Sequence, residues 1–222
     1  MIITIKSSFP LLIFSILSFM LFMLMIPPSP IDAEEGQPSI LFLGDSLTEG
    51  YGVSREEAFP SLVSEKLAEL GYSHVRLINA GISGSTTASA LSRLRWYKRV
   101  KPRVLFLALG ANDGLRGLPL DAMEKNLDDT IKLALKWDMK VILAGMEIPP
   151  NYGAQYTDGF RSVYQSLAKK HDIILMPFLL KDVGGVDTYN QGDGIHPNAR
   201  GYKIVADNVL PYIVDVLEKI TE

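Results

Sequence analysis

Three residue types that together hydrolyse esters occur in this sequence at spacings that could bring them together. Ser46 offers a hydroxyl group, and Asp193 lies three residues before His196 in a stretch that contains a glycine. At that spacing the carboxylate can hold one nitrogen of the imidazole ring and leave the other for Ser46. The other two histidines have structural explanations, because His74 opens a predicted strand and His171 ends a predicted helix, where a positive charge suits the helix dipole. We therefore predict that Ser46 is a nucleophile, His196 its base and Asp193 the group that orients the base.

Ester hydrolysis also needs hydrogen-bond donors for the negative charge that develops on the carbonyl oxygen. A glycine presents its backbone N–H without an obstructing side chain, and Gly84 could act in this way. Asn112 carries a neutral amide that can donate without acting as a base. Together with the N–H of Ser46, these two residues would form an oxyanion hole of three donors.

The elements that must position these residues follow from the pattern of apolar segments. Five short apolar runs rich in branched side chains predict buried parallel strands, and five longer amphipathic segments between and after them predict helices. The predicted strands are 39–44, 75–79, 104–109, 141–144 and 173–175, and the predicted helices are 56–70, 86–99, 121–138, 157–171 and 198–219. This alternation predicts an α/β fold, a three-layer sandwich with a central five-stranded parallel sheet and helices on both faces.

The residues of interest come directly after strands of this predicted sheet. Ser46 follows the first strand, Gly84 the second and Asn112 the third, while Asp193 and His196 precede the last helix. Active sites of open α/β sheets lie at the carboxyl ends of the strands. Any one of these stretches alone is better explained as a cap or a turn, but a coincidence of all four at one sheet edge is improbable.

These stretches resemble the blocks of the GDSL, or SGNH, hydrolase family. The similarity runs from about Ile40 to the last helix and is greatest to the bacterial exported esterase, thioesterase and lysophospholipase branch; the blocks are Gly44-Asp45-Ser46-Leu47, Gly84, Gly110-Ala111-Asn112-Asp113 and Asp193-Gly194-Ile195-His196. The resemblance implies a flavodoxin-like fold, a Ser46-His196-Asp193 triad and an oxyanion hole of Ser46, Gly84 and Asn112. It also implies lysophospholipid, simple ester and thioester substrates and no metal or organic cofactor.

Four apolar loop residues are candidates for substrate binding. They could form a wall against the acyl chain, although packing on the sheet explains them equally well. These residues are Leu115, Leu118, Ile148 and Tyr152.

The first 33 residues are predicted to be a signal peptide. Lys6 precedes an apolar run from Leu11 to Ile26, and Ala33 offers a small residue for cleavage. As a helix, this run would span roughly 24 Å, somewhat less than the hydrocarbon core of a bilayer. We expect an exported protein, periplasmic or secreted; an uncleaved inner-membrane anchor and a buried core helix are the alternatives.

Composition limits the remaining possibilities. The chain has 222 residues, a formal charge of −3 and no cysteine. We expect one catalytic domain over residues 34–222, a monomer with no nucleic-acid partner and no thiolate chemistry. The alternatives to an esterase are a glycan O-deacetylase, a non-catalytic lipid or glycan binder and, less well supported, a metal-dependent phosphoesterase.

Overall fold

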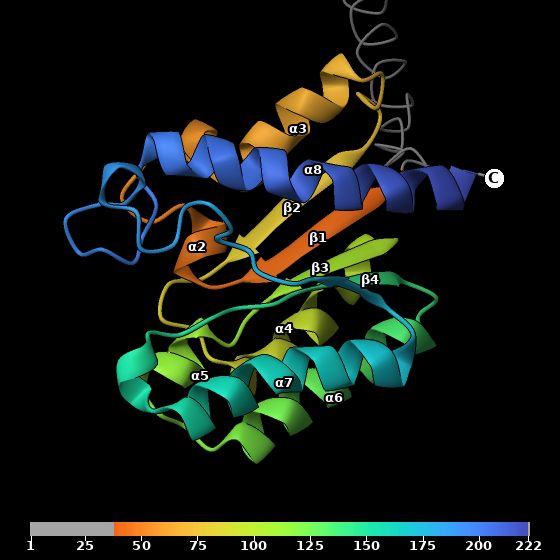
Figure 1. Ribbon diagram of the computed structural model, residues 1–222. Coiled ribbons are helices and arrows are strands. Elements are labelled where there is room, and N and C mark those ends of the chain that lie inside the picture. The colour runs from red at the N-terminus through yellow and green to blue at the C-terminus, as the bar shows by residue number, and fades with distance from the viewer. Residues whose placement is uncertain (1–37, 222) are drawn as a thin grey trace, which may run out of the picture. The chain divides into compact units, whose positions relative to one another are not determined.

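The computed structural model describes residues 38–221, and these form a parallel sheet between two layers of helices (Figure 1). The strands follow the order β2-β1-β3-β4-β5, and every neighbouring pair is parallel. This order, with its switch point beside β1, is that of the flavodoxin-like folds. The strands are β1 Ser39–Gly44, β2 Arg76–Gly81, β3 Val104–Ala108, β4 Lys140–Ala144 and β5 Ile174–Met176. The predicted fold class is therefore confirmed.

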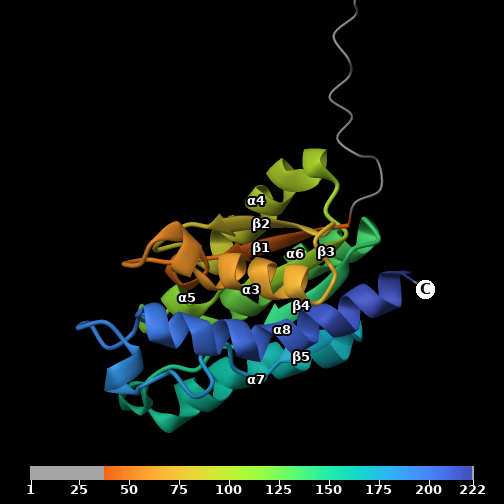
Figure 2. The same cartoon turned by 90° about the horizontal axis from the view of Figure 1, so that it is seen from above.

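Helices α3 and α8 cover one face of the sheet, and α4, α6 and α7 cover the other (Figures 1 and 2). The central strands β1 and β3 are buried along their whole length because both faces are covered. The helices are α2 Ser46–Glu49, α3 Phe59–Glu69, α4 Ala90–Tyr97, α5 Ala111–Leu115, α6 Leu120–Lys136, α7 Ala154–His171 and α8 Ala199–Thr221, with short 3₁₀ turns at Arg55–Glu57, Thr87–Ser89, Lys98–Val100, Pro150–Tyr152 and Asp187–Tyr189.

The hydrophobic core is built within this domain. Its buried apolar side chains lie between Ile40 and Leu217, and the ring of Phe42 packs against those of Phe59 and Phe106 at centroid distances of 5.6 and 5.1 Å. Residues 37–222 form one compact unit. The predicted signal segment, residues 1–33, lies outside the described residues. Among helices within residues 38–221, none combines the length and the apolar character that crossing a membrane requires.

Two short helices that carry site residues were not predicted. The expected helix 56–70 is α3 preceded by a 3₁₀ turn, and α2 lies between it and β1. Ser46 therefore begins a one-turn helix of its own, and Asn112 lies in the five-residue α5. Neither helix is long enough to show an apolar period of 3.6 residues, which is why the sequence pattern does not reveal them.

The start of the last helix also differs from the expectation. The helix was expected to begin at residue 198, but α8 begins at Ala199, and Pro197 forms an isolated antiparallel bridge with Asn190. The side chain of Asn198 caps the helix by accepting hydrogen bonds from the N–H groups of Arg200 and Gly201. The bridge fixes the loop that carries Asp193 and His196 before the helix starts.

Candidate active site

Ser46 is held at the carboxyl end of β1 by a tight connection into α2. The carboxylate of Asp45 caps α2 by accepting a hydrogen bond from Leu47 N at 3.0 Å. A Cβ atom at Gly44 would lie only 1.9 Å from Thr48 Oγ1, so the strand and the helix can approach this closely only with glycine at position 44. Ser46 is 8% exposed and lines the cavity described below.

A continuous chain of hydrogen bonds joins Ser46, His196 and Asp193. His196 Nε2 lies 2.9 Å from Ser46 Oγ, and His196 Nδ1 lies 2.7 Å from Asp193 Oδ2. The other oxygen of Asp193 accepts hydrogen bonds from the N–H groups of Ile195 and His196 at 3.0 and 3.1 Å. These bonds fix the carboxylate against its own loop, and the carboxylate in turn fixes the imidazole ring against the hydroxyl of Ser46.

The pKa of Asp193 reflects this setting. Partial burial raises it, but the hydrogen bonds from the His196 side chain and from the N–H groups of Ile195 and His196 outweigh burial and lower the pKa to about 2. Asp193 is therefore ionised at neutral pH, and an ionised carboxylate stabilises a positive charge on the neighbouring imidazole ring.

The three expected oxyanion donors lie at this same edge, in the segments that follow β1, β2 and β3. The N–H groups of Ser46 and Gly84 have no hydrogen-bond partner within residues 38–221. Gly84 has a φ of +74°, and its carbonyl accepts a hydrogen bond from Arg116 Nη2 at 2.9 Å. Asn112 lines the same cavity as Ser46, and its Nδ2 lies 3.4 Å from Asp45 Oδ2. Gly84 is not among the residues that line that cavity.

Asp113 connects the segments that carry Gly84 and Asn112. Its buried carboxylate accepts hydrogen bonds from Thr87 N at 2.9 Å and from Thr87 Oγ1 at 2.6 Å. Asn126 on α6 donates a further hydrogen bond to Thr87 Oγ1 at 3.1 Å. Because Asp113 follows Asn112 and Thr87 comes three residues after Gly84, this network fixes the two donor loops relative to each other.

Arg93 on α4 forms hydrogen bonds to the ends of β1 and β2. Its guanidinium group donates from Nη2 to the carbonyl oxygens of Gly44, at 2.9 Å, and of Ala80. Burial lowers the pKa of Arg93, and its Nε and Nη1 atoms are buried without a partner within residues 38–221. Arg93 thus holds the strand end that leads directly to Asp45 and Ser46.

Asp45 is buried close to Ser46. It is 1% exposed, and burial raises its pKa to about 6, although hydrogen bonds from Leu47 N and Asn112 act in the opposite direction. Sequence reasoning recognised Asp45 in its motif but gave it no role. Nothing in the residue types alone signals its burial, because a serine preceded by an aspartate can equally well lie at a surface turn.

A cavity of about 400 Å³ opens beside Ser46 and His196. Of the four residues predicted to contact an acyl chain, Leu115 and Ile148 line this cavity, whereas Leu118 and Tyr152 do not. Tyr152 instead donates a hydrogen bond from its hydroxyl to the carbonyl oxygen of Leu115 at 2.7 Å. It therefore supports the loop of Leu115 from outside the cavity.

Several cavity residues were missed by sequence reasoning. Met146 follows β4, and Phe178 and Leu180 follow β5, so the rule that active sites lie beyond the carboxyl ends of strands could have found them. Tyr51 was also missed, although its ring lies 4.7 Å from that of His196 and is half exposed. It lies in a loop after α2, a helix that the sequence pattern does not reveal.

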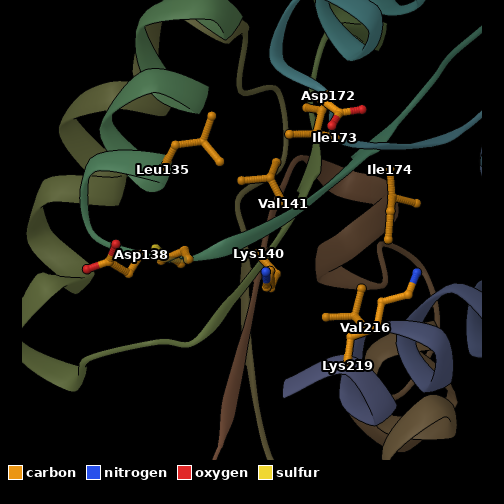
Figure 3. A pocket seen from close by; sticks show the side chains of 10 residues that line it. Leu135, Asp138, Lys140, Val141, Asp172, Ile173, Ile174, Val216 and Lys219 are labelled. Atoms are coloured by element: carbon orange, nitrogen blue, oxygen red, sulfur yellow. The ribbon is translucent and has the colours of Figure 1, made fainter. Parts of the chain in front are cut away.

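The amino edge of the same sheet has a cavity of different chemistry. It measures about 450 Å³ and lies between the starts of β4 and β5 and the end of α8 (Figure 3). Its charged lining residues are Asp138, Lys140, Asp172 and Lys219, and its lining contains no hydroxyl group and no imidazole. Across the part of the chain that the structure describes, no group of three or more histidine and acidic side chains could hold a metal ion.

Known proteins resemble this chain in sequence. The sequence model of the GDSL-like Lipase/Acylhydrolase family matches residues 42–204. The chain is 37% identical over 180 residues to Esterase TesA of Pseudomonas aeruginosa, covering 81% of this chain and 89% of that protein. It is 36% identical over 170 residues to Thioesterase 1/protease 1/lysophospholipase L1 of Escherichia coli K12, covering 76% of this chain and 80% of that protein.

Solved structures give the same result. The psychrotrophic esterase EstA of a Pseudoalteromonas species superimposes with a TM-score of 0.77 at 34% identity, covering 81% of this chain and 98% of that one. The crystal structure of TesA superimposes with a TM-score of 0.75 at 37% identity, covering 78% of this chain and 96% of that one. The chain therefore belongs to the GDSL-like, or SGNH, hydrolase family and is a serine esterase of that family.

Proposed function

We propose that this esterase hydrolyses carboxylic esters and thioesters through an acyl-enzyme intermediate formed on Ser46. The observation that carries the proposal is the unbroken hydrogen-bond chain from Ser46 Oγ through the His196 ring to Asp193, placed at the mouth of an apolar cavity. Asp113 and Arg93, which hold the surrounding loops, support it because catalytic geometry requires rigid positioning.

In the first step Ser46 Oγ attacks the carbonyl carbon while His196 Nε2 takes the hydroxyl proton. Asp193 stabilises the positive charge on the ring, and the N–H groups of Ser46 and Gly84 with the amide of Asn112 donate to the oxyanion. Collapse of the tetrahedral intermediate breaks the ester bond, and His196 gives its proton to the leaving alcohol or thiol. Water, activated by His196, then releases the fatty acid and regenerates the free hydroxyl of Ser46.

The substrates that fit best are single-chain acyl esters and thioesters, including lysophospholipids. The cavity wall contains the apolar side chains of Leu115, Met146, Ile148, Phe178 and Leu180, which suit an acyl chain better than a sugar. The E. coli relative is a thioesterase and lysophospholipase, and a structure of EstA is that of the enzyme inhibited by monoethylphosphonate. We further propose that the protein is exported, on the basis of its N-terminal apolar run.

The test compares residues 34–222 with the Ser46→Ala variant in the presence of EDTA. Nitrophenyl acyl esters, lysophosphatidylcholine and acyl thioesters are the substrates, and circular dichroism confirms folding. We expect kcat to fall by roughly 10⁶-fold in the variant, because the nucleophile and its base act as a unit. Turnover that survives Ser46→Ala, or that EDTA abolishes, would contradict the serine mechanism. A folded and inactive wild-type protein would instead direct attention to acetylated glycans.

A further inference from the structure

A cluster of unpaired positive charges lies at the amino edge of the sheet, opposite the active site. Residues 91–103 contain six of the 22 lysines and arginines of the chain and no aspartate or glutamate. One of the six, Arg93, points inward to the ends of β1 and β2, but the others are exposed. This concentration is notable because the whole chain has a formal charge of −3.

Strand pairing aligns part of this charge along the edge. Arg76 at the start of β2 and Arg103 just before β3 flank Ser39, the first residue of β1. Arg76 N donates to the carbonyl oxygen of Pro38, and Arg103 N donates to that of Ser39. Since neighbouring strands lie about 4.8 Å apart, the two arginine backbones are separated by about 10 Å.

The turn that connects α4 to β3 extends this row. It carries Lys98, Arg99 and Lys101, all exposed. These three residues together with Arg76 and Arg103 are called the basic edge below. None of the five forms an ion pair with an acidic residue within residues 38–221, so no carboxylate neutralises their charges. Lys98 instead lies over the ring of Trp137, at 5.3 Å.

An exposed tryptophan adjoins the basic edge. Trp96 at the end of α4 is 56% exposed, and the guanidinium of Arg99 lies over its ring at 3.8 Å. A tryptophan beside cationic side chains is typical of a surface that meets the headgroup region of a bilayer, where the ring is apolar on its faces and polar at its N–H.

The point at which the chain enters the sheet indicates what could bind the basic edge. The apolar run of residues 11–26 is joined to Ser39, between Arg76 and Arg103, through residues 27–38. Twelve residues can span at most about 40 Å, so a membrane that holds the run lies within reach of this edge for as long as the run is attached. We propose that the basic edge and Trp96 form a docking surface for an anionic phospholipid membrane.

This orientation has a consequence for the esterase. The strands of Figure 1 point toward α2 and α5, so the catalytic cavity lies at the far end of the sheet from the basic edge. The six residues of β1 alone separate the two edges by about 20 Å. The docked enzyme therefore faces the aqueous phase with its active site and takes up substrates that have left the bilayer, such as single-chain esters.

The test uses residues 37–222, which contain the entire described core, so that the apolar run cannot bind membranes by itself. Trp137→Phe leaves Trp96 as the sole tryptophan. Its fluorescence is measured during titration with vesicles of equal parts phosphatidylglycerol and phosphatidylcholine, and with vesicles of phosphatidylcholine alone. We expect a blue shift and binding with the anionic vesicles only, weakened by salt. Absence of binding, or equal binding to both kinds of vesicle, would overturn the proposal.

The charge variants decide which surface binds. Arg99→Gln, Lys101→Gln and Arg103→Gln are combined in one protein. We expect roughly 100-fold weaker vesicle binding, since each cation near an anionic surface contributes about fivefold. Hydrolysis of a soluble nitrophenyl ester should be unchanged in this variant and in wild-type protein bound to vesicles, because the catalytic edge is free.

The matched control removes the same number of positive charges from the carboxyl edge of the sheet. Arg55, Lys181 and Lys203 are exposed, lie outside the basic edge, and are changed together to glutamine. We expect binding within about twofold of wild type. An equal loss of vesicle binding in this control would mean that net charge alone drives binding. Tighter binding to a single-stranded oligonucleotide than to anionic vesicles would indicate a different partner. Either result would overturn the proposal.

Discussion

The domain contains two histidine–aspartate pairs of nearly equal geometry. His196 Nδ1 lies 2.7 Å from Asp193 Oδ2, and His171 Nε2 lies 2.6 Å from Asp128 Oδ1. In both cases a carboxylate fixes an imidazole ring. The first pair lies at the carboxyl edge of the sheet beside Ser46, whereas the second joins the end of α7 to α6.

The surroundings of the two carboxylates differ. Asp128 is also contacted by Lys132 at 2.6 Å and by Lys170 at 2.8 Å. Burial raises the pKa of Asp128, but the hydrogen bonds from Lys132, Lys170 and His171 outweigh it and hold the pKa well below the usual range. This carboxylate is shared among three groups, so it neutralises a cluster of charge between two helices. Asp193 serves one imidazole ring and the backbone of its own loop.

The comparison shows that a hydrogen-bonded histidine–aspartate pair does not identify an active site. What distinguishes His196 is its second nitrogen, which lies 2.9 Å from the hydroxyl of Ser46 at the mouth of a cavity. His171 is 10% exposed and has no hydroxyl group hydrogen-bonded to its other nitrogen within residues 38–221. Removing the His196 pair should therefore lower kcat, whereas removing the His171 pair should lower the free energy of unfolding.

The largest contrast is expected between His196→Ala and His171→Ala. His196→Ala removes the proposed base and should lower kcat by roughly 10⁶-fold, with little change in the free energy of unfolding. His171→Ala should leave kcat within about twofold of wild type and lower the free energy of unfolding by about 1–2 kcal/mol, because it removes a hydrogen bond to a charged, buried group. Ester hydrolysis and urea unfolding measure the two effects. Comparable losses of kcat in both variants would mean that the two pairs are not functionally distinct.

Replacing the two aspartates should give the same contrast in kcat, with a smaller difference between the variants. Asp193→Asn leaves a hydrogen-bonding side chain but cannot stabilise a positive imidazole, so kcat should fall by about 10⁴-fold. Asp128→Asn should leave kcat unchanged and cost about 2 kcal/mol of unfolding free energy, since Lys132, Lys170 and His171 then lose their shared counter-charge. The kinetic result would count against the assigned triad if Asp193→Asn retained most of its activity.

How far the sequence could predict this arrangement depends on the length of each element. The strands and long helices were found because their apolar patterns repeat over enough residues, and the loops after the strands located Ser46, Asn112 and His196. Leu118 and Leu115 could not be separated, since both are apolar and they are only three residues apart. Only the turn of α5 places Leu115 at the cavity, and that short helix has no detectable period.

The buried carboxyl group of Asp45 and the carboxylate of Asp128 should make the free energy of unfolding depend on pH in opposite directions. The raised pKa of Asp45, about 6, means that the folded state holds a proton that the unfolded state releases near pH 4. The free energy of unfolding should therefore decrease as pH rises from about 4 to 6, by up to about 3 kcal/mol. The lowered pKa of Asp128 instead contributes stability above about pH 4 that is lost as the pH falls.

Replacing each aspartate separates these contributions. Asp45→Asn should flatten the decrease between pH 4 and 6, and Asp128→Asn should reduce the loss of stability below about pH 4. Asparagine at position 45 can still accept the hydrogen bond from Leu47 N that caps α2. Urea unfolding followed by circular dichroism across this range gives both slopes. An unchanged slope in Asp45→Asn would show that this carboxyl group does not hold a proton in the folded protein.

The smallest expected effect concerns the acyl chain and uses two leucines that are three residues apart. Leu115 lines the cavity beside Ser46, whereas Leu118 lies outside it and accepts a hydrogen bond at its carbonyl oxygen from the hydroxyl of Tyr156. Leu115→Ala should shift the preference among nitrophenyl esters by roughly 10-fold in kcat/KM for the chain that contacts it, because a few methylene contacts are worth about 1–3 kcal/mol. Leu118→Ala keeps that backbone hydrogen bond and should leave the chain-length profile unchanged. A shift of equal size in both variants would mean that the loop acts through its overall packing, and the cavity wall would then not be defined by the side chain of Leu115.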